Sequence, residues 1–120
     1  GACQTVRDIL TKLNKTNGVR GCMIVNRDGI VVASDFSVEV DEAGVGAVTS
    51  SILAALDGAL KRINMGKFAR FIITGSESKV AVVNAGQAIL LILLQRDVNM
   101  GMVNLDIKEA ASAVQTKSKM

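Results

Sequence analysis

Five short apolar segments, most of them joined by tight turns, constrain the fold of this 120-residue chain more than any other feature. The links at residues 75–78 and 85–87 are too short for a crossover, and so is Asn26-Arg27-Asp28-Gly29. Strands connected in this way form antiparallel hairpins, and Gly29 occupies the turn position that requires positive φ. The sequence therefore predicts five strands, at residues 19–25, 30–33, 68–74, 79–84 and 88–94.

Apolar residues recur with a helical period in the rest of the chain. The predicted helices span residues 4–15, 41–64 and 99–117. Asp41 is the expected N-cap of the second helix, with Glu42 in its first turn. The strands at 19–25 and 88–94 are apolar almost throughout, which is typical of strands buried on both faces. We predict an α+β fold over a single domain, residues 1–120. Its order is α-β-β-α-β-β-β-α, and helices cover both faces of a five-stranded antiparallel sheet of undetermined strand order.

The helix predicted at 41–64 carries three different faces, although a lone domain needs only two. At about 100° per residue, six large residues form a stripe that we expect to face the core. These are Val45, Val48, Ile52, Leu56, Leu60 and Ile63. A second stripe, the small-residue stripe, consists of Gly44, Ala47, Ser51, Ala55 and Gly58. The opposite flank is polar and contains Ser50, Asp57 and Lys61, with Leu53 at its border.

The small-residue stripe favours close approach by another backbone. Three glycines, Gly44, Gly46 and Gly58, each weaken the helix by about 0.5–1 kcal/mol relative to alanine, which suggests a packing reason. Three interpretations are open: the helix lies tightly on its own sheet, the small residues are tolerated without purpose, or a second copy of the chain occupies the stripe. We favour the second copy, because the large apolar stripe already supplies an intramolecular face. The strand at 68–74 follows directly, and its edge can pair with another chain. The predicted dimer interface comprises Gly44, Ala47, Ser51, Ala55, Gly58, Phe68, Arg70 and Ile72.

Composition argues against several classes of function. The net charge is only +3, and three Phe with no Tyr or Trp offer little to stack on nucleic-acid bases. The absence of histidine removes Ser/His/Asp, Cys/His and histidine-metal sites. Cys22 is expected to be a buried packing residue, and Cys3 is expected to be exposed. Carboxylate pairs such as Asp41 and Glu42 sit where capping explains them. We therefore predict no catalytic residue, no cofactor and no metal.

Targeting signals are absent from the sequence as it stands. The longest uninterrupted apolar run, Ala88–Leu94, is far shorter than the ~20 residues that span a bilayer. No signal-peptide pattern opens the chain, and two cysteines do not make a disulfide scaffold. We predict a cytoplasmic protein with no membrane span.

The chain resembles the roadblock/dynein light chain family from about Val6 to Val114. The most telling stretches are 18–35, with the sequence GVRGCMIVNRDGIVVASD, and 88–94, with the sequence AILLILL. The first is similar to the family's hairpin, G-v-x-G-x-x-v-x-x-x-D-G-x-x-x-a-S. The segment 96–101 and the helix after it resemble the prokaryotic branch, of the gliding-motility protein B type.

The resemblance implies a profilin-like sandwich and a homodimer, with the central helices side by side and the third strands joining the two sheets. It also implies that the dimer binds a small Ras-like GTPase as a non-enzymatic regulator or scaffold. The candidate residues for this contact are Ser50, Leu53, Asp57 and Lys61. The alternatives are a structural adaptor in a motor or polarity complex and a domain that senses a small ligand.

Overall fold

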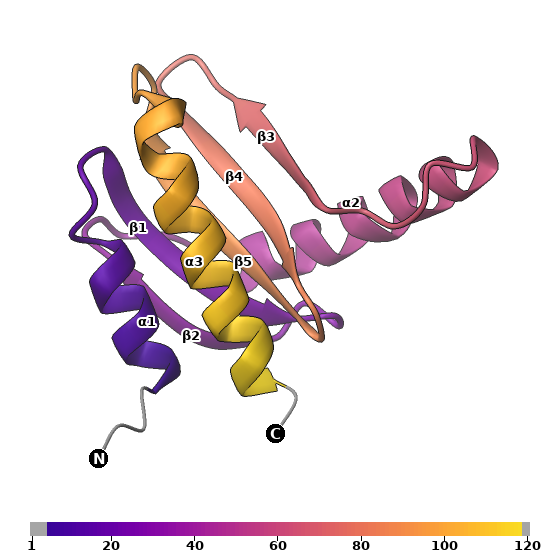
Figure 1. Ribbon diagram of the computed structural model, residues 1–120, viewed down its shortest axis with the longest axis horizontal. Coiled ribbons are helices and arrows are strands. Elements are labelled where there is room, and N and C mark those ends of the chain that lie inside the picture. Colours follow the sequence, from indigo (N-terminus) through magenta and orange to yellow (C-terminus); the bar gives the residue numbers. More distant parts are fainter. Residues whose placement is uncertain (1–4, 119–120) are drawn as a thin grey trace.

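The structure, a computed structural model, describes residues 5–118 and has the predicted order of elements (Figure 1). The helices are α1 (Val6–Leu13), α2 (Glu42–Arg62) and α3 (Met100–Ser118). The strands are β1 (Val19–Asn26), β2 (Val31–Phe36), β3 (Arg70–Thr74), β4 (Ser78–Ala85) and β5 (Ala88–Gln95). The predicted exposure of Cys3 and the predicted start of the first helix at residue 4 lie outside the described residues.

The strands form one antiparallel sheet in the order β2-β1-β5-β4-β3, which confirms the predicted α+β architecture. β5 lies in the middle and pairs with β1, where Leu91 is opposite Met23. β2 and β3 are the two edges. β3 therefore pairs within the domain on one side only, with Ile72 opposite Ala81 of β4.

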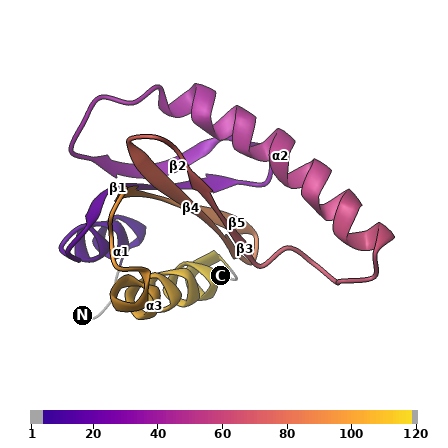
Figure 2. The same cartoon turned by 90° about the horizontal axis from the view of Figure 1, so that it is seen from above.

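Helices cover both faces of the sheet, as predicted, but they do so unequally (Figure 2). α1 and α3 lie together on one face and enclose the larger core, in which Leu10 and Ile107 are buried. α2 crosses the other face alone, over a smaller core that includes Val25 and Leu53. The pleat of β5 serves both cores, because successive side chains point to opposite faces. Leu90, Ile92 and Leu94 face α1 and α3, whereas Ile89 and Leu91 face α2.

Local hydrogen bonds fix both ends of α2. Asp41 Oδ1 accepts from the backbone N–H of Gly44 at 3.2 Å, which confirms the predicted N-cap. At the other end Asn64 adopts a positive φ of 57°. The N–H groups of Asn64 and Met65 donate to carbonyls of the last turn, which is a Schellman ending. The chain therefore turns back sharply toward β3.

Some element boundaries differ from the prediction. β2 continues to Phe36, into a segment predicted as loop, because Asp35 pairs with Cys22 of β1 despite its polar side chain. β3 begins at Arg70 rather than at residue 68. The predicted positive φ at Gly29 is confirmed, at 87°.

α2 is the one helix of residues 5–118 that is long and apolar enough to cross a membrane by length and composition, with a mean hydropathy of 1.5 over its most apolar window. Core helices of globular domains meet the same criterion. Gly46 and Leu53 pack this helix on the sheet. We therefore assign α2 as a helix of the domain and not as a membrane span.

Candidate functional site

The described residues offer no arrangement suited to nucleophilic or metal catalysis. Within residues 5–118, no group of three or more His, Cys, Asp or Glu side chains is placed to hold a metal. Cys22 is fully buried, as predicted, and its Sγ donates to the Leu10 carbonyl at 3.4 Å. Burial, and secondarily the charge of Asp35, raises the pKa of the Cys22 thiol from 9.0 to about 12. The thiol is therefore protonated at neutral pH, unlike a catalytic cysteine.

Strand β3 provides an open sheet edge. Arg70 and Ile72 are exposed on the face of the sheet that carries α3, and Arg70 Nη1 donates to Asn104 Oδ1 at 2.9 Å. Phe71, on the opposite face, packs against Phe68 with ring centroids 5.3 Å apart. An edge strand of this kind can pair with another chain.

The side of α2 that faces the core differs from the predicted one. Leu53 is 3% exposed and packs on the sheet, whereas Val48 and Ile63 of the predicted core stripe are 58% and 61% exposed. Gly46 explains the difference, because its backbone approaches Gly29 of the β1–β2 turn so closely that a Cβ would meet the Gly29 carbonyl. The prediction was wrong because it assigned the core to the bulkiest stripe, while a glycine turns another side of the helix toward the sheet.

An apolar groove opens between α2 and strand β3. It encloses about 380 Å³, and Val48 and Ile52 of α2 face Phe71 and Ile73 of β3 across it. Its other lining residues are Asp41, Gly44, Val45, Thr49, Val80, Val82 and Leu91. Large apolar side chains that sequence analysis assigned to the core therefore line an open surface instead.

The C-terminal end of α2 projects beyond the sheet, past the start of β3 (Figures 1 and 2). Ile63 and Met65, which follow the helix here, are 61% and 67% exposed. The groove and this projecting end both expose apolar side chains. The β3 side of the domain therefore exposes more apolar surface than it would if α2 were packed on the sheet along its whole length.

The four residues predicted to bind a partner do not form one exposed cluster. Lys61 is exposed, but Leu53 is buried in the core, so its predicted place at the surface is wrong. Ser50 Oγ donates to a backbone carbonyl of the β1–β2 turn at 2.9 Å. Asp57 Oδ1 accepts from the backbone N–H of Phe68 at 3.4 Å. Ser50 and Asp57 therefore fasten α2 to neighbouring segments.

The residues predicted for the dimer interface are also divided. Phe68 precedes β3 and is 4% exposed, so the prediction of a surface contact there is wrong. In the small-residue stripe, Ala47, Ser51, Ala55 and Gly58 are exposed, and Gly44 is half-buried. A Cβ added at Gly58 would meet no atom within 4 Å. The stripe therefore lies on the outward side of α2, and its contact with a second copy stays a prediction.

Sequence comparison assigns this arrangement to a family. The Roadblock/LC7 domain matches residues 5–95, from the N-cap of α1 to the end of β5. The chain belongs to the Roadblock/LC7 domain family. Members of this family are generally non-catalytic.

Relatives and solved structures extend the match. The uncharacterized protein MJ0310 of Methanocaldococcus jannaschii is 37% identical over 106 residues, which are 88% of this chain and 93% of that protein. MglB of Myxococcus xanthus has the same fold, with a TM-score of 0.91 at 18% identity, and covers 99% of this chain and 98% of that one. Profilin IB of Acanthamoeba castellanii has a TM-score of 0.70 at 16% identity, over 95% and 99% of the two chains. The predicted profilin-like fold is confirmed.

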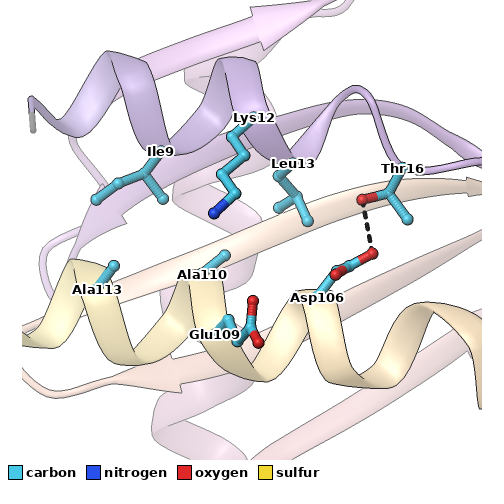
Figure 3. Close-up of a pocket in the computed structure, with 8 residues that line it drawn as sticks. All are labelled: Ile9, Lys12, Leu13, Thr16, Asp106, Glu109, Ala110 and Ala113. Carbon is cyan, nitrogen blue, oxygen red and sulfur yellow. Dashed lines mark hydrogen bonds between the residues drawn. The ribbon is translucent and has the colours of Figure 1, made fainter.

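The roadblock domain also contains a small pocket between α1 and α3, drawn in Figure 3. It encloses about 120 Å³, and its walls include Ile9, Leu13 and Ala110. Thr16 Oγ1 donates to Asp106 Oδ2 at 3.0 Å beside it. None of the predicted site residues lines this pocket. Lys12 and Glu109 also line it, so the lining is partly charged, and we attribute the pocket to the packing of α1 against α3.

Sequence reasoning missed the groove of this roadblock domain because it placed Val48 and Ile52 in the core. One signal was present in the sequence. Gly46 is the one glycine of α2 outside the small-residue stripe, and a glycine that lies away from a proposed interface is a candidate for close packing within the domain. Gly46 would have indicated the true core side of α2.

Proposed function

We propose that this roadblock domain forms a homodimer and that the dimer binds a small Ras-like GTPase in the cytoplasm as a non-enzymatic regulator or scaffold. The observation that carries the dimer is the open edge of β3 beside an unfilled apolar groove and a projecting apolar helix end. These three features lie on one side of the domain, so one contact can use all of them.

A two-fold axis beside β3 satisfies these features reciprocally. In a two-fold dimer the same surface patch of each copy contacts that of the other. β3 of one copy then pairs with β3 of the other, and the projecting end of each α2 reaches over the other copy's groove. Ile63 and Met65 would cover Phe71 and Ile73 there. Fully burying one such side chain contributes roughly 1.5–3 kcal/mol, and each contact occurs twice.

The proposal revises the part that α2 plays in the interface. Arg70 and Ile72 of β3 remain interface residues, and the helix contributes Val48 and Ile52. The small-residue stripe borders this seam at Gly44, and this arrangement replaces the predicted contact between the stripes of the two copies. In the dimer the two stripes then form one flat, outward surface without long side chains, which suits close docking of a folded partner. The exposed Lys61 lies at the margin of this surface.

The GTPase partner is supported by the family. The resemblance to the gliding-motility protein B type implies such a partner, and MglB of Myxococcus xanthus shares the fold of this chain. The residues that the structure describes offer no catalytic constellation with which to hydrolyse a nucleotide directly. Regulation would therefore act by holding the GTPase's own switch regions in an ordered state.

The test uses a recombinant Ras-like GTPase from the same genome, loaded with GDP or with a slowly hydrolysed GTP analogue. Calorimetry should detect binding that depends on the nucleotide, and the Gly58→Arg variant should weaken it about tenfold or more, because a long cation occupies the docking surface. Ser112→Arg adds the same side chain to an exposed position of α3 and should leave binding unchanged.

Turnover measurements then separate the alternatives. A changed rate of GTP hydrolysis in the complex supports regulation, and binding without a rate change supports a scaffold or adaptor. No binding in either nucleotide state contradicts the GTPase proposal and favours a ligand-sensing domain.

A further inference from the structure

A second open cleft lies at the C-terminal end of α2, on the side of the helix away from the apolar groove. It encloses about 760 Å³, within the range of small-molecule sites. Its lining residues are Arg27, Asp57, Lys61, Asn64, Gly66, Lys67 and Asn84. They come from the β1–β2 turn, the end of α2, the segment that returns from α2 to β3, and strand β4. Figure 2 shows this segment turning at the end of α2 and running back toward β3.

Hydrogen bonds build one wall of this basic cleft. Asn84 Nδ2 donates to the Phe68 carbonyl at 2.9 Å, and Asn84 Oδ1 accepts from Arg27 Nη2 at 2.6 Å. The same Nη2 donates to the Gly86 carbonyl at 3.0 Å. Both of these bonds use one nitrogen, so the guanidinium is held in place while Nη1 and Nε keep donors for a ligand. A fixed guanidinium loses less freedom on binding than a mobile one.

The charge in the basic cleft is unbalanced. Three cations, Arg27, Lys61 and Lys67, share it with one carboxylate, Asp57, which already accepts a backbone hydrogen bond. None of the three cations forms an ion pair with a residue that the structure describes. The C-terminal end of the α2 dipole accounts for Lys61. It does not account for Arg27 and Lys67, which two other segments bring to the same space.

We propose that the basic cleft binds a soluble ligand carrying phosphate with two or more negative charges. A planar guanidinium matches the geometry of phosphate oxygens, and the two ammonium groups add point charges around it. A polynucleotide is a poor alternative, because stacking platforms are missing: the cleft lining contains no aromatic residue. This site shares only Lys61 with the margin of the outward surface of α2, and it does not depend on the GTPase.

Inorganic pyrophosphate is the probe, titrated by calorimetry into the 120-residue chain. We expect binding that weakens as the ionic strength rises toward about 0.15 M. The Arg27→Gln/Lys67→Glu variant should weaken binding about tenfold or more, because it removes a charge-assisted donor and reverses a charge. Lys67→Glu alone, at an exposed position, should give an intermediate loss and covers the case in which Arg27→Gln disturbs the turn.

The matched control is Arg7→Gln/Lys15→Glu, which makes the same change of net charge at exposed positions of α1 and the segment after it. It should bind pyrophosphate like the wild type. The proposal is overturned if pyrophosphate gives no heat up to about 10 mM, if the control loses as much as the cleft variant, or if the chain binds vesicles of anionic phospholipid but not pyrophosphate. Gly58→Arg should retain pyrophosphate binding, so failure of this site and failure of the GTPase proposal are separate results.

Discussion

The two faces of the sheet are covered in different ways. Under α1 and α3, the inward side chains of β5, Leu90, Ile92 and Leu94, are fully buried. On the α2 face, by contrast, Val48 of the helix and Ile73 of β3 keep 58% and 45% of their surface exposed. The core under α1 and α3 is closed to solvent, whereas the core under α2 is partly open to solvent. The α1/α3 face therefore holds the more completely buried core, while the α2 face leaves apolar surface exposed, which is the surface that we propose a second copy covers.

The largest expected effect is on the reactivity of Cys22, which is buried in the core under α1 and α3. In a Cys3→Ser variant, Cys22 is the remaining thiol. Its pKa of about 12, against 9.0 for an ordinary thiol, makes the folded form roughly 1000-fold poorer in thiolate at pH 8, since each pKa unit is about tenfold. A thiol reagent should therefore react far more slowly with the native protein than with the protein in denaturant.

The sign of the pH dependence follows from the same shift. Because the folded pKa is raised, stabilisation from the protonated thiol is complete below about pH 9 and is lost as the pH rises toward 12. Equal reaction rates with and without denaturant at pH 8 would show that the reagent reaches Cys22 in the native protein. The core under α1 and α3 would then not be closed, which would contradict the difference between the two faces.

A second prediction compares truncations on the two faces. Leu90→Ala leaves a cavity under α1 and α3 and should lower the free energy of unfolding by about 2–5 kcal/mol. Val48→Ala removes surface that is exposed in the monomer and should cost less than about 0.5 kcal/mol at a concentration that dissociates the dimer. Denaturant unfolding at several protein concentrations measures both. Similar costs for the two variants in the monomer would contradict the comparison.

A smaller effect concerns the N-terminal end of α2. Asp41→Ala removes the acceptor for the N–H of Gly44 and should cost about 1 kcal/mol of unfolding free energy. Asp41→Asn keeps an oxygen in place and should cost only a few tenths. A thermal unfolding series distinguishes the two variants. An alanine variant as stable as the wild type would mean that the Asp41 cap does not stabilise α2.

Much of the fold follows from local chemistry in the sequence. Short links force antiparallel pairing of the strands, and the apolar sequences of β1 and β5 require cover on both faces of the sheet. Asp41 caps the start of α2 because its carboxylate accepts a hydrogen bond from the first turn. The extension of β2 to Phe36 does not follow, because Ser34 and Asp35 are polar and their pairing depends on β1. The edge position of β3 does not follow either, since strand order is set by long-range contacts.

The candidate site was harder to predict than the fold. Helical periodicity states which residues of α2 share a side, but it does not state which side meets the sheet. That choice depends on the approach of Gly46 to Gly29, a contact between segments about 17 residues apart that no local pattern reveals. The exposure of Val48 and the burial of Leu53 both follow from it. The basic cleft likewise needs the fold, because Arg27 and Lys67 are far apart in the sequence.

The most direct test of the account is the mass in solution of three proteins measured by light scattering with refractive-index detection, which suits a chain without Tyr or Trp. At tens of micromolar, the wild type and Gly58→Arg should have twice the mass of one chain, because Gly58 faces outward. Val48→Arg should have the mass of a single chain, because a buried cation opposes the seam. A monomeric wild type, or a Gly58→Arg variant that dissociates while Val48→Arg remains dimeric, would contradict the assignment of the open face of α2 to dimerisation.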